Sequence, residues 1–408
     1  MTGRLDGLQV YSFEHLSSTQ QLHHNIMSEA LPVKVISIDS KIHSGKNDVD
    51  RHNKPRLRRS LIISSLLEKY KDIVHVETIS AELAAKCDLV ELFSSVHDVH
   101  MVQFLVNAWT KWVAMGPDWY DECCQPGWNV DAGPPPFIPC HASFRRDGIE
   151  RPSKNVMGTF GYYCTDLMTP IVGSLVTELQ EDATIICSSV DSAFDSKPSV
   201  VYALTTHPGH HVNYDNFGGY CYLNNAALCA RLMQRRLGTG IRVAIIDIDY
   251  HCGNGTASIF YKDPDIFFTS IHCDPEVEYP FNAGYENQVG EGPGKNTTLH
   301  IPLDPGATWK EYKPALQKAM EAIMDFGVGG LVVSMGLDTY EGDSVAVSKG
   351  GFKLSGADYH EMGKFIGSFL KNKEVTTIFV QEGGYKMDVI GEAAADVVGG
   401  FSKGATVA

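Results

Sequence analysis

The sequence has little basic charge for its length and no run of apolar residues that approaches the length of a membrane span. Its 408 residues carry 34 Lys and Arg against 49 Asp and Glu, a net charge of −15 at pH 7. This balance argues against binding to a nucleic-acid backbone and suits the attraction of cationic substrates. The N-terminus also lacks an apolar segment, so we expect neither a cleaved signal peptide nor a membrane anchor.

The ten cysteines form no CxxC pair and no regular framework, and several lie in apolar segments, where Cys acts as a small hydrophobe. We therefore expect a reducing compartment, with the cytoplasm as the default. A nuclear location, or export into another cell without a cleaved signal, stays open. The hydrophobic share of 43% and the charged share of 20% exclude wholesale disorder, coiled coil and collagen.

Short runs of apolar and β-branched residues predict strands at 32–39, 200–205, 242–247, 266–270, 328–334 and 375–380. Helical patterns alternate with them at 57–70, 96–115, 164–181, 223–235, 309–325 and 355–370. Strands that are apolar on both faces are typical of a buried parallel sheet covered by helices. We predict an α/β fold with one central, mostly parallel sheet, and a functional site beyond the carboxyl ends of its strands.

The segment 116–154 is rich in Pro and Gly and too long for a routine connection. Two interpretations stay open: a decorated surface loop, or a loop that shapes an active site or a subunit contact. Its three consecutive prolines, with Trp119 and Trp128, suit a stiff apolar contact. We predict that it shapes the entrance of the site and contributes to a homodimer.

Two of the predicted strands end in metal-ligand residues. The run RVAIIDIDYH places Asp247, Asp249 and His251 on one side of a strand end, because side chains alternate along a strand. A second strand, GLVVSM, leads to Asp338. Two carboxylates and one imidazole, with a position left open, are typical of catalytic zinc. The alternative for Asp249 and His251 is a strand-end cap or an ion pair.

Two further strand ends carry groups for proton transfer. The sequence HPGHH supplies His210 and His211, and neutral or protonated imidazoles can serve as base and acid. The sequence EGGY supplies Tyr385, whose phenol can donate to an oxyanion. The alternatives are surface histidines and a packed loop tyrosine. We expect His207 to be structural.

Together these motifs resemble the zinc-dependent histone deacetylase family, which has the arginase/deacetylase fold. The residues that carry the resemblance are DIDYHCGNGT, HPGHH, GGYCYLNNAA, GLDTYEGD and EGGY, over about residues 57–401. Within the family the chain resembles most the bacterial acetylpolyamine amidohydrolases and histone-deacetylase-like amidohydrolases, through GYYC, FGGYC, SIHCDP, GEGPG and FKLSGADY. The implied organisation is an N-terminal segment at 1–56 that begins the domain, a deacetylase domain at 57–401 containing the insertion, and a tail at 402–408.

The resemblance implies a role for each residue of the site. Asp249, His251 and Asp338 would bind zinc, while Asp247 would orient His210 and Asn254 would orient His211. Because an amide holds a protonated imidazole less firmly than a carboxylate does, His211 should be the less basic ring. The remaining assignments are Tyr385 as oxyanion donor, Tyr220, Tyr279, Gly219 and Val345 at the substrate tunnel, and a structural potassium ion near Asp247, Asp249, His251 and Ser270.

These features predict a zinc-dependent hydrolase of N-acetyl amides. Deacetylation of acetyl-lysine in peptides or protein tails is the main interpretation. Met157 and Met168 stand where acetylpolyamine enzymes carry acidic residues, and Asp166 is acidic but shifted by two positions. Val345 stands where a polyamine-selective member carries an acidic gatekeeper. Acetylpolyamines or other small acyl amines are the alternative. A non-catalytic scaffold that binds acetyl-lysine is a remote one, and a dimanganese ureohydrolase would need DxHxD instead of DxDxH.

Overall fold

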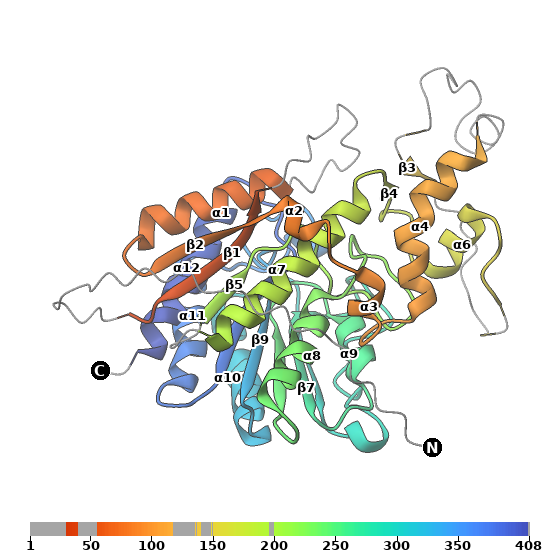
Figure 1. Ribbon diagram of the computed structural model, residues 1–408. Helices are drawn as coiled ribbons and strands as arrows, with labels where there is room; N and C mark the ends of the chain where they lie inside the picture. Colours follow the sequence, from red (N-terminus) through yellow and green to blue (C-terminus); the bar gives the residue numbers. More distant parts are fainter. Residues whose placement is uncertain are drawn as a thin grey trace.

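The computed structural model describes residues 30–39, 55–116, 150–195 and 200–406, together with 135, 137–139 and 148 (Figure 1). Most of the insertion at 116–154 lies outside the described residues, so its predicted contribution to the entrance and to a homodimer stays a prediction. Among the helices of the described part, none is long and apolar enough to cross a membrane.

In the part of the chain that the structure describes, the core is an eight-stranded sheet in the order β2-β1-β5-β10-β9-β6-β7-β8. Every neighbouring pair runs parallel. The strands are β1 (Val33–Asp39), β2 (Val74–Ser80), β5 (Val200–Ala203), β6 (Val243–Asp247), β7 (Ile266–Cys273), β8 (Thr298–Leu303), β9 (Gly330–Met335) and β10 (Thr376–Gln381). A short antiparallel pair, β3 (Phe137–Ile138) with β4 (Ile171–Val172), lies outside this sheet.

Helices connect the strands and cover both faces of the sheet (Figure 1). They are α1 (Pro55–Tyr70), α2 (Ala81–Ala84), α3 (Leu89–Phe93), α4 (Val99–Met115), α6 (Val156–Tyr163), α7 (Leu175–Asp195), α8 (Asn225–Leu237), α9 (Asn254–Phe260), α10 (Trp309–Phe326), α11 (Gly356–Leu370) and α12 (Ile390–Ala405). The predicted α/β class with a parallel sheet is confirmed.

The alternation of side chains along each strand divides the core into two layers. On β6, Val243 and Ile245 pack with α7 and α8 on one face. The intervening Ala244 and Ile246 pack with α1, α10, α11 and α12 on the other. Because both faces are covered, these strands need apolar residues at every position, which is why they show no polar alternation in the sequence.

One predicted helix, at 164–181, has the wrong beginning, and several elements were not predicted. Residues 164–174 are not helical: Asp166 accepts a hydrogen bond from the backbone N–H of Met168 at 2.6 Å, which closes a turn, and Pro170 then leads into β4. The long helix begins only at Leu175. The strands β2 and β8 and the helix α12 were missed. On β2, for example, only Val74 and Ile79 are buried, so the apolar signal is weak.

The strand order explains how four distant motifs come together. β5, β10, β9 and β6 are consecutive neighbours in the sheet. They are the strands that HPGHH, EGGY, GLD and DIDYH follow. Since the strands run parallel, all four motifs lie at the same edge of the sheet.

Candidate active site

A pocket of about 460 Å³ opens at the carboxyl ends of these four strands. Its floor contains the predicted metal ligands, the tandem histidines and Tyr385, and its walls contain the predicted tunnel residues. The lining consists of Asp166, Met168, His210, His211, Gly219, Tyr220, Asp249, His251, Glu278, Tyr279, Asp338, Ser344, Val345, Val347 and Tyr385.

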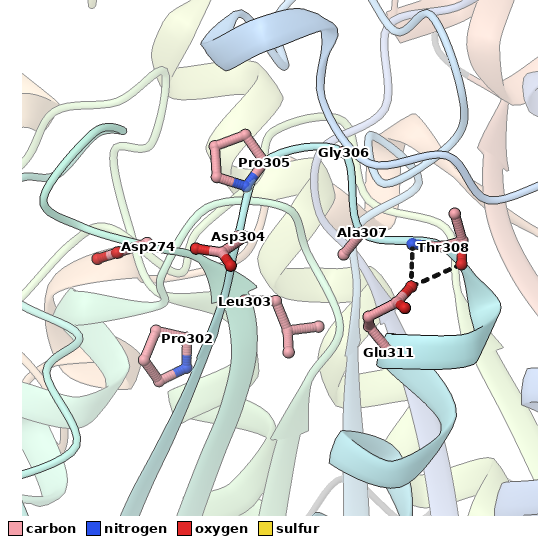
Figure 2. A pocket seen from close by; sticks show the side chains of 9 residues that line it. All are labelled: Asp274, Pro302, Leu303, Asp304, Pro305, Gly306, Ala307, Thr308 and Glu311. Carbon is pink, nitrogen blue, oxygen red and sulfur yellow. Dashed lines mark hydrogen bonds between the residues drawn. The ribbon is translucent and has the colours of Figure 1, made fainter.

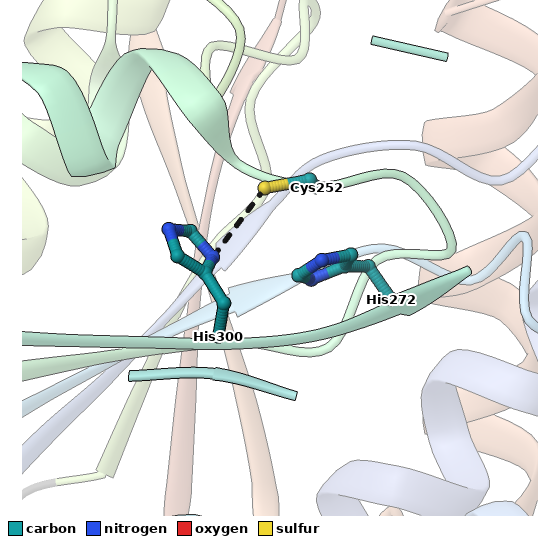
Figure 3. Close-up of side chains that lie close together, drawn as sticks. All are labelled: Cys252, His272 and His300. Carbon is teal, nitrogen blue, oxygen red and sulfur yellow. Dashed lines mark hydrogen bonds between the residues drawn. The ribbon is translucent and has the colours of Figure 1, made fainter. Parts of the chain in front are cut away.

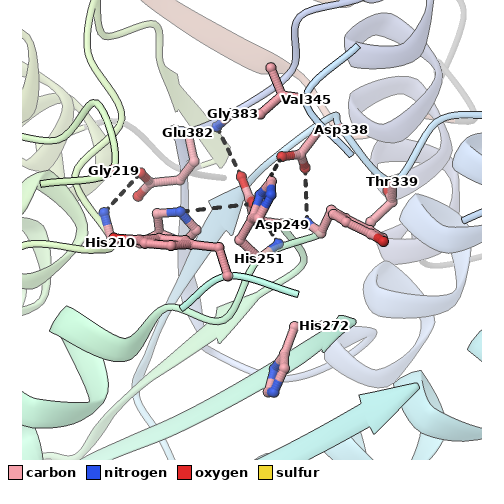
Figure 4. Close-up of polar contacts among 12 residues, drawn as sticks. His210, Gly219, Asp249, His251, His272, Asp338, Thr339, Val345, Glu382 and Gly383 are labelled. Carbon is pink, nitrogen blue, oxygen red and sulfur yellow. Dashed lines mark hydrogen bonds and ion pairs between the residues drawn. The ribbon is translucent and has the colours of Figure 1, made fainter. Parts of the chain in front are cut away.

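The possible metal ligands Asp249, His251 and Asp338 point toward one another at the base of the pocket (Figure 4). Their ligand atoms all lie within 4.8 Å of one another, and all three residues are buried. His251 Nδ1 lies 3.0 Å from Asp338 Oδ2 and 3.3 Å from Asp249 Oδ1. Burial, followed by the charge of Asp249, raises the pKa of Asp338 to about 7. Two crowded carboxylates and one imidazole form a donor set that fits a divalent cation such as zinc.

The two carboxylates are also fixed by backbone donors. Asp249 Oδ2 accepts a hydrogen bond from the N–H of Gly383 at 3.0 Å, and Asp338 Oδ1 accepts one from Tyr250 at 2.8 Å. A Cβ atom on Gly383 would lie 2.5 Å from Asp249 Oδ2, so only glycine lets the β10 loop pass this close. These bonds orient the ligand oxygens before any ion arrives.

The tandem histidines have different partners and opposite pKa shifts. His210 Nδ1–H donates to Asp247 Oδ2 at 2.9 Å, and His211 Nδ1–H donates to Asn254 Oδ1 at 2.8 Å. Burial disfavours the charged form of His210, but Asp249 and Asp247 outweigh it and raise its pKa to about 10. Burial, with the charges of His210 and His251, lowers the pKa of His211 well below its usual value. His211 is the less basic ring, as expected, but the hydrogen bond to Asn254 acts against this and raises its pKa, so burial and the two neighbouring histidines are the cause.

The walls of the pocket are aromatic. The ring of Tyr279 meets the ring of His211 edge-on at 4.8 Å between centroids, and Tyr220 lies 6.0 Å from Tyr385. Gly219, with φ of 61°, precedes Tyr220, and a Cβ atom there would lie 2.4 Å from His211 Cδ2. Asp166 Oδ2 accepts a hydrogen bond from the N–H of Gly219 at 2.5 Å. This carboxylate therefore fixes the turn that presents Tyr220.

The entrance is mostly uncharged among the described residues that line the pocket. Met168 is 58% exposed and Val347 is 68% exposed, and both line the pocket together with Val345. The carboxylate of Glu278 is buried and accepts hydrogen bonds from Tyr279 N–H and Ser348 N–H, both at 2.9 Å. Met157, in contrast, is not among the lining residues and packs against the core.

Two buried groups around the floor were not assigned a role from the sequence. Glu382 Oε2 accepts hydrogen bonds from the N–H groups of Gly209 and His210 at 2.6 and 3.2 Å, and its Oε1 accepts one from Ser334 Oγ at 2.6 Å. It thereby joins three strand ends under the tandem histidines. In the sequence, only the position of Glu382 within the EGGY motif indicated that it belongs to the site. Arg58 donates to the carbonyl oxygens of Glu382 and Thr206 at 3.2 and 2.6 Å and supports the same region from α1.

His207 lies outside the pocket, as expected for a structural residue. Its Nδ1 contacts Asp182 at 3.1 Å and its Nε2 contacts Glu178 at 3.2 Å, both on α7. Burial opposes protonation of His207, but these carboxylates raise its pKa to about 10. Asp182 also accepts from Thr206 N–H at 2.5 Å, so the start of the HPGHH turn is attached to α7.

A second group of possible metal ligands, Cys252, His272 and His300, is buried behind the floor (Figure 3). Cys252 Sγ lies 3.6 Å from His300 Nδ1. Both ring nitrogens of His272 already have partners, Ser270 Oγ at 2.8 Å and the Gly284 carbonyl at 2.9 Å. A metal ion would have to break one of these bonds, so the group is better explained as a buried hydrogen-bond network.

A separate surface pocket at the end of β8 contains three carboxylates, from Asp274, Asp304 and Glu311 (Figure 2). Glu311 caps α10 by accepting from the N–H and hydroxyl of Thr308 at 3.0 and 2.6 Å. Asp274 closes a turn by accepting from Glu276 N–H at 2.9 Å. These local bonds explain two of the three acidic side chains.

Comparison with known proteins agrees with this geometry. Residues 52–401 match the model of the histone deacetylase domain. The chain is 34% identical to acetylpolyamine amidohydrolase 2 of Pseudomonas aeruginosa over 369 residues, which cover 90% of this chain and 98% of that protein. It is 35% identical to an acetylpolyamine amidohydrolase of Mycoplana ramosa over 77% of this chain and 84% of that one. The crystal structure of an acetylpolyamine aminohydrolase from Burkholderia pseudomallei superimposes with a TM-score of 0.70 and 26% identity, covering 85% of this chain and 90% of that chain.

Proposed function

Because this chain belongs to the histone deacetylase family, as an enzyme of the deacetylase and amidohydrolase type, we propose that it hydrolyses the acetyl amides of small aliphatic amines, acetylpolyamines first among them. The observation that carries the proposal is the meeting of Asp249, His251 and Asp338 with the tandem histidines and Tyr385 in one pocket.

Zinc is the cation that this donor set suits. When bound, it would act as a Lewis acid that polarises the acetyl carbonyl and lowers the pKa of water. The chain supplies the proton transfers. His211, whose Nδ1–H is held by Asn254, keeps a lone pair on Nε2 and accepts a proton from the attacking water. The low pKa of His211 keeps this ring neutral and available as a base.

The other two groups act on the charge that develops and on the departing amine. His210, protonated and held by Asp247, donates a proton from Nε2 to the leaving nitrogen. Tyr385 donates its O–H to the oxygen of the tetrahedral intermediate. Tyr220 and Tyr279 hold an unbranched chain between their rings and exclude a branched one.

The preference for small acetylated amines rests on the relatives. Two bacterial proteins named acetylpolyamine amidohydrolases align over 77% and 90% of this chain at 35% and 34% identity. The net charge of −15 also attracts a cationic substrate at long range. The sequence alone favoured acetyl-lysine over acetylpolyamines, and the relatives reverse this order.

Acetyl-lysine in peptides is the second candidate, and the entrance favours it. Met168, Val345 and Val347 offer no charge to a second ammonium group. The carboxylates of Asp166 and Glu278 line the pocket, but each already accepts hydrogen bonds from backbone N–H groups.

A potassium ion near Asp247 and Ser270 is part of the proposal on the strength of the family resemblance alone. The two residues are paired partners on β6 and β7, and both are fully buried. Dialysis into sodium-free and potassium-free buffer, followed by readdition of each ion, tests it. If neither activity nor melting temperature responds to either ion, the potassium site is contradicted.

The test of the function is a rate comparison on acetylputrescine, acetylspermidine and an acetyl-lysine peptide, together with the zinc content of the purified protein. We expect about one zinc per chain, because each ligand set holds one ion, and higher kcat/KM on the two acetylpolyamines. Higher kcat/KM on the peptide would make acetyl-lysine the substrate. A zinc-loaded protein with no turnover of any of the three would contradict the proposal.

A further inference from the structure

Asp343 is a buried carboxylate that no part of the proposed reaction uses. It lies in the loop after β9, five residues beyond Asp338, and is 5% exposed. Its Oδ2 accepts hydrogen bonds from the N–H groups of Tyr385 and Lys386 at 2.7 and 2.9 Å, and its Oδ1 accepts one from Val345 N–H at 2.9 Å. One side chain therefore connects Tyr385 at the floor to Val345 at the entrance.

The backbone that leads to Tyr385 needs such a support. Gly383 and Gly384 precede it, and Gly384 has φ of 118°, a conformation that glycine adopts readily. Two consecutive glycines can adopt many backbone conformations at a low cost in free energy. The backbone before Tyr385 therefore does not by itself fix the direction of the Tyr385 side chain. Without Asp343, the N–H group of Tyr385 would also lose its partner in a buried place, which carries a free-energy cost.

A donor to an oxyanion accelerates a reaction only when it is already in place, because reorganisation during the reaction cancels the gain. A displacement of the order of 1 Å can lower the rate by about 10²-fold. The hydroxyl of Tyr385 is at the end of a long side chain, so a small change at its backbone moves it by such an amount.

We propose that Asp343 is a positioning residue, which holds Tyr385 in its productive orientation through the backbone and ties that orientation to the entrance loop at Val345. The proposal rests on the proposed function, since it concerns the same oxyanion. It assigns the two carboxylate oxygens different tasks. Oδ2 determines kcat through Tyr385, and Oδ1 determines KM through Val345.

The test is a double-mutant cycle of Asp343→Ala and Tyr385→Phe on the substrate that wild type prefers. In wild type, Asp343→Ala should lower kcat by about 10²-fold with zinc content unchanged. In the Tyr385→Phe background, which has no hydroxyl to position, the same change should cost much less. An equal loss in both backgrounds means that the two residues act independently and overturns the proposal.

Asp343→Asn separates the two arms and remains informative if the alanine variant does not fold. The amide oxygen can still accept from Tyr385 and Lys386, while the NH₂ group then faces the N–H of Val345, donor against donor. We expect kcat to be largely kept and KM to rise. A fall in kcat with unchanged KM would contradict the assignment of the two oxygens.

Asp88→Ala is the matched control. Asp88 also accepts hydrogen bonds from two backbone N–H groups, those of Val90 and Glu91, both at 3.0 Å, but it caps α3 outside the pocket. The Asp88→Ala variant should be less stable than wild type and should keep the wild-type kcat. Absence of turnover in wild type would contradict the proposed function itself, and an additive cycle in an active enzyme would contradict only the role of Asp343.

Discussion

The floor and the entrance of the pocket are built in opposite ways. At the floor, Asp249, His210 and Glu382 are buried, and each has partners from a different strand end. At the entrance, Met168 and Val347 are more than half exposed and apolar. The floor is determined by the order of four parallel strands, and the entrance is formed by loops, one between α6 and β4 with Met168 and one between β9 and β10 with Val347.

This difference separates the chemistry from the choice of amine. The acetyl group is common to all candidate substrates, so a floor fixed by the sheet serves each of them. The amine extends toward the entrance, where loop side chains can be exchanged without disturbing a strand. The floor therefore supports the deacetylase assignment firmly, while the substrate depends on a few exposed side chains.

The largest effect should come from removing a metal ligand at the floor. Asp249→Ala or His251→Ala takes away one of three protein ligands, so zinc and activity should be lost together. Metal analysis and turnover of the preferred substrate measure both, and a chelator should reproduce the loss in wild type. His100→Ala, an exposed histidine of α4, is the control. A variant with full zinc and full turnover would rule out the metal assignment.

A smaller effect is expected from Tyr385→Phe, which leaves the metal ligands untouched. Removal of one oxyanion donor should lower kcat by about 10²–10³-fold. Zinc content and melting temperature should stay near the wild-type values. The exposed Tyr214→Phe serves as control. Turnover within a few-fold of wild type would show that the phenol does not stabilise the oxyanion.

The sequence indicated that the residues of the floor would meet, because each motif there follows an apolar strand. Asp249, His251, Asp338, His210, His211 and Tyr385 all line one pocket, as expected from parallel strand ends. Local patterns were sufficient, since the side chains lie within a few residues of strands whose direction the pattern indicates.

The supports of the floor could not be predicted in the same way. Asp343 and Glu382 act through bonds to residues 42 and 173 positions away, and no local pattern shows such partners. Residues 164–174 illustrate the converse case. A helical pattern was present, but the turn closed by Asp166 and the pairing of β4 with β3 decided the structure.

At the entrance, a single charge should change the preference for the amine. Met168→Glu would place a carboxylate beside the pocket, and a charge pair at about 4 Å is worth ~1–4 kcal/mol, depending on the effective dielectric. We expect kcat/KM for acetylspermidine to rise about tenfold relative to the acetyl-lysine peptide, since ~1.4 kcal/mol corresponds to one factor of ten. The gain should shrink at ~0.5 M salt because the site is exposed.

The control is Met168→Gln, which is neutral and of similar size. It should leave the ratio of kcat/KM for acetylspermidine to that for the peptide unchanged. An equal response to Glu and Gln would show that charge at the entrance does not select the amine.

The last effect concerns the attachment of the floor to α7, and it is measured as stability. His207 has its pKa raised from 6.5 to about 10 by Asp182 and Glu178 against the opposing effect of burial. A raised pKa in the folded state means that this ion pair contributes its full stability below the unfolded value and loses it as the pH rises through about 10. His207→Gln should therefore lower the free energy of unfolding by about 1–3 kcal/mol near pH 6, because the buried carboxylate of Asp182 and the partly buried one of Glu178 lose a charged partner. The gap between wild type and variant, measured by denaturant unfolding across the pH range, should narrow toward pH 10. A gap that is constant with pH would mean that His207 stabilises the HPGHH turn as a neutral, packed ring.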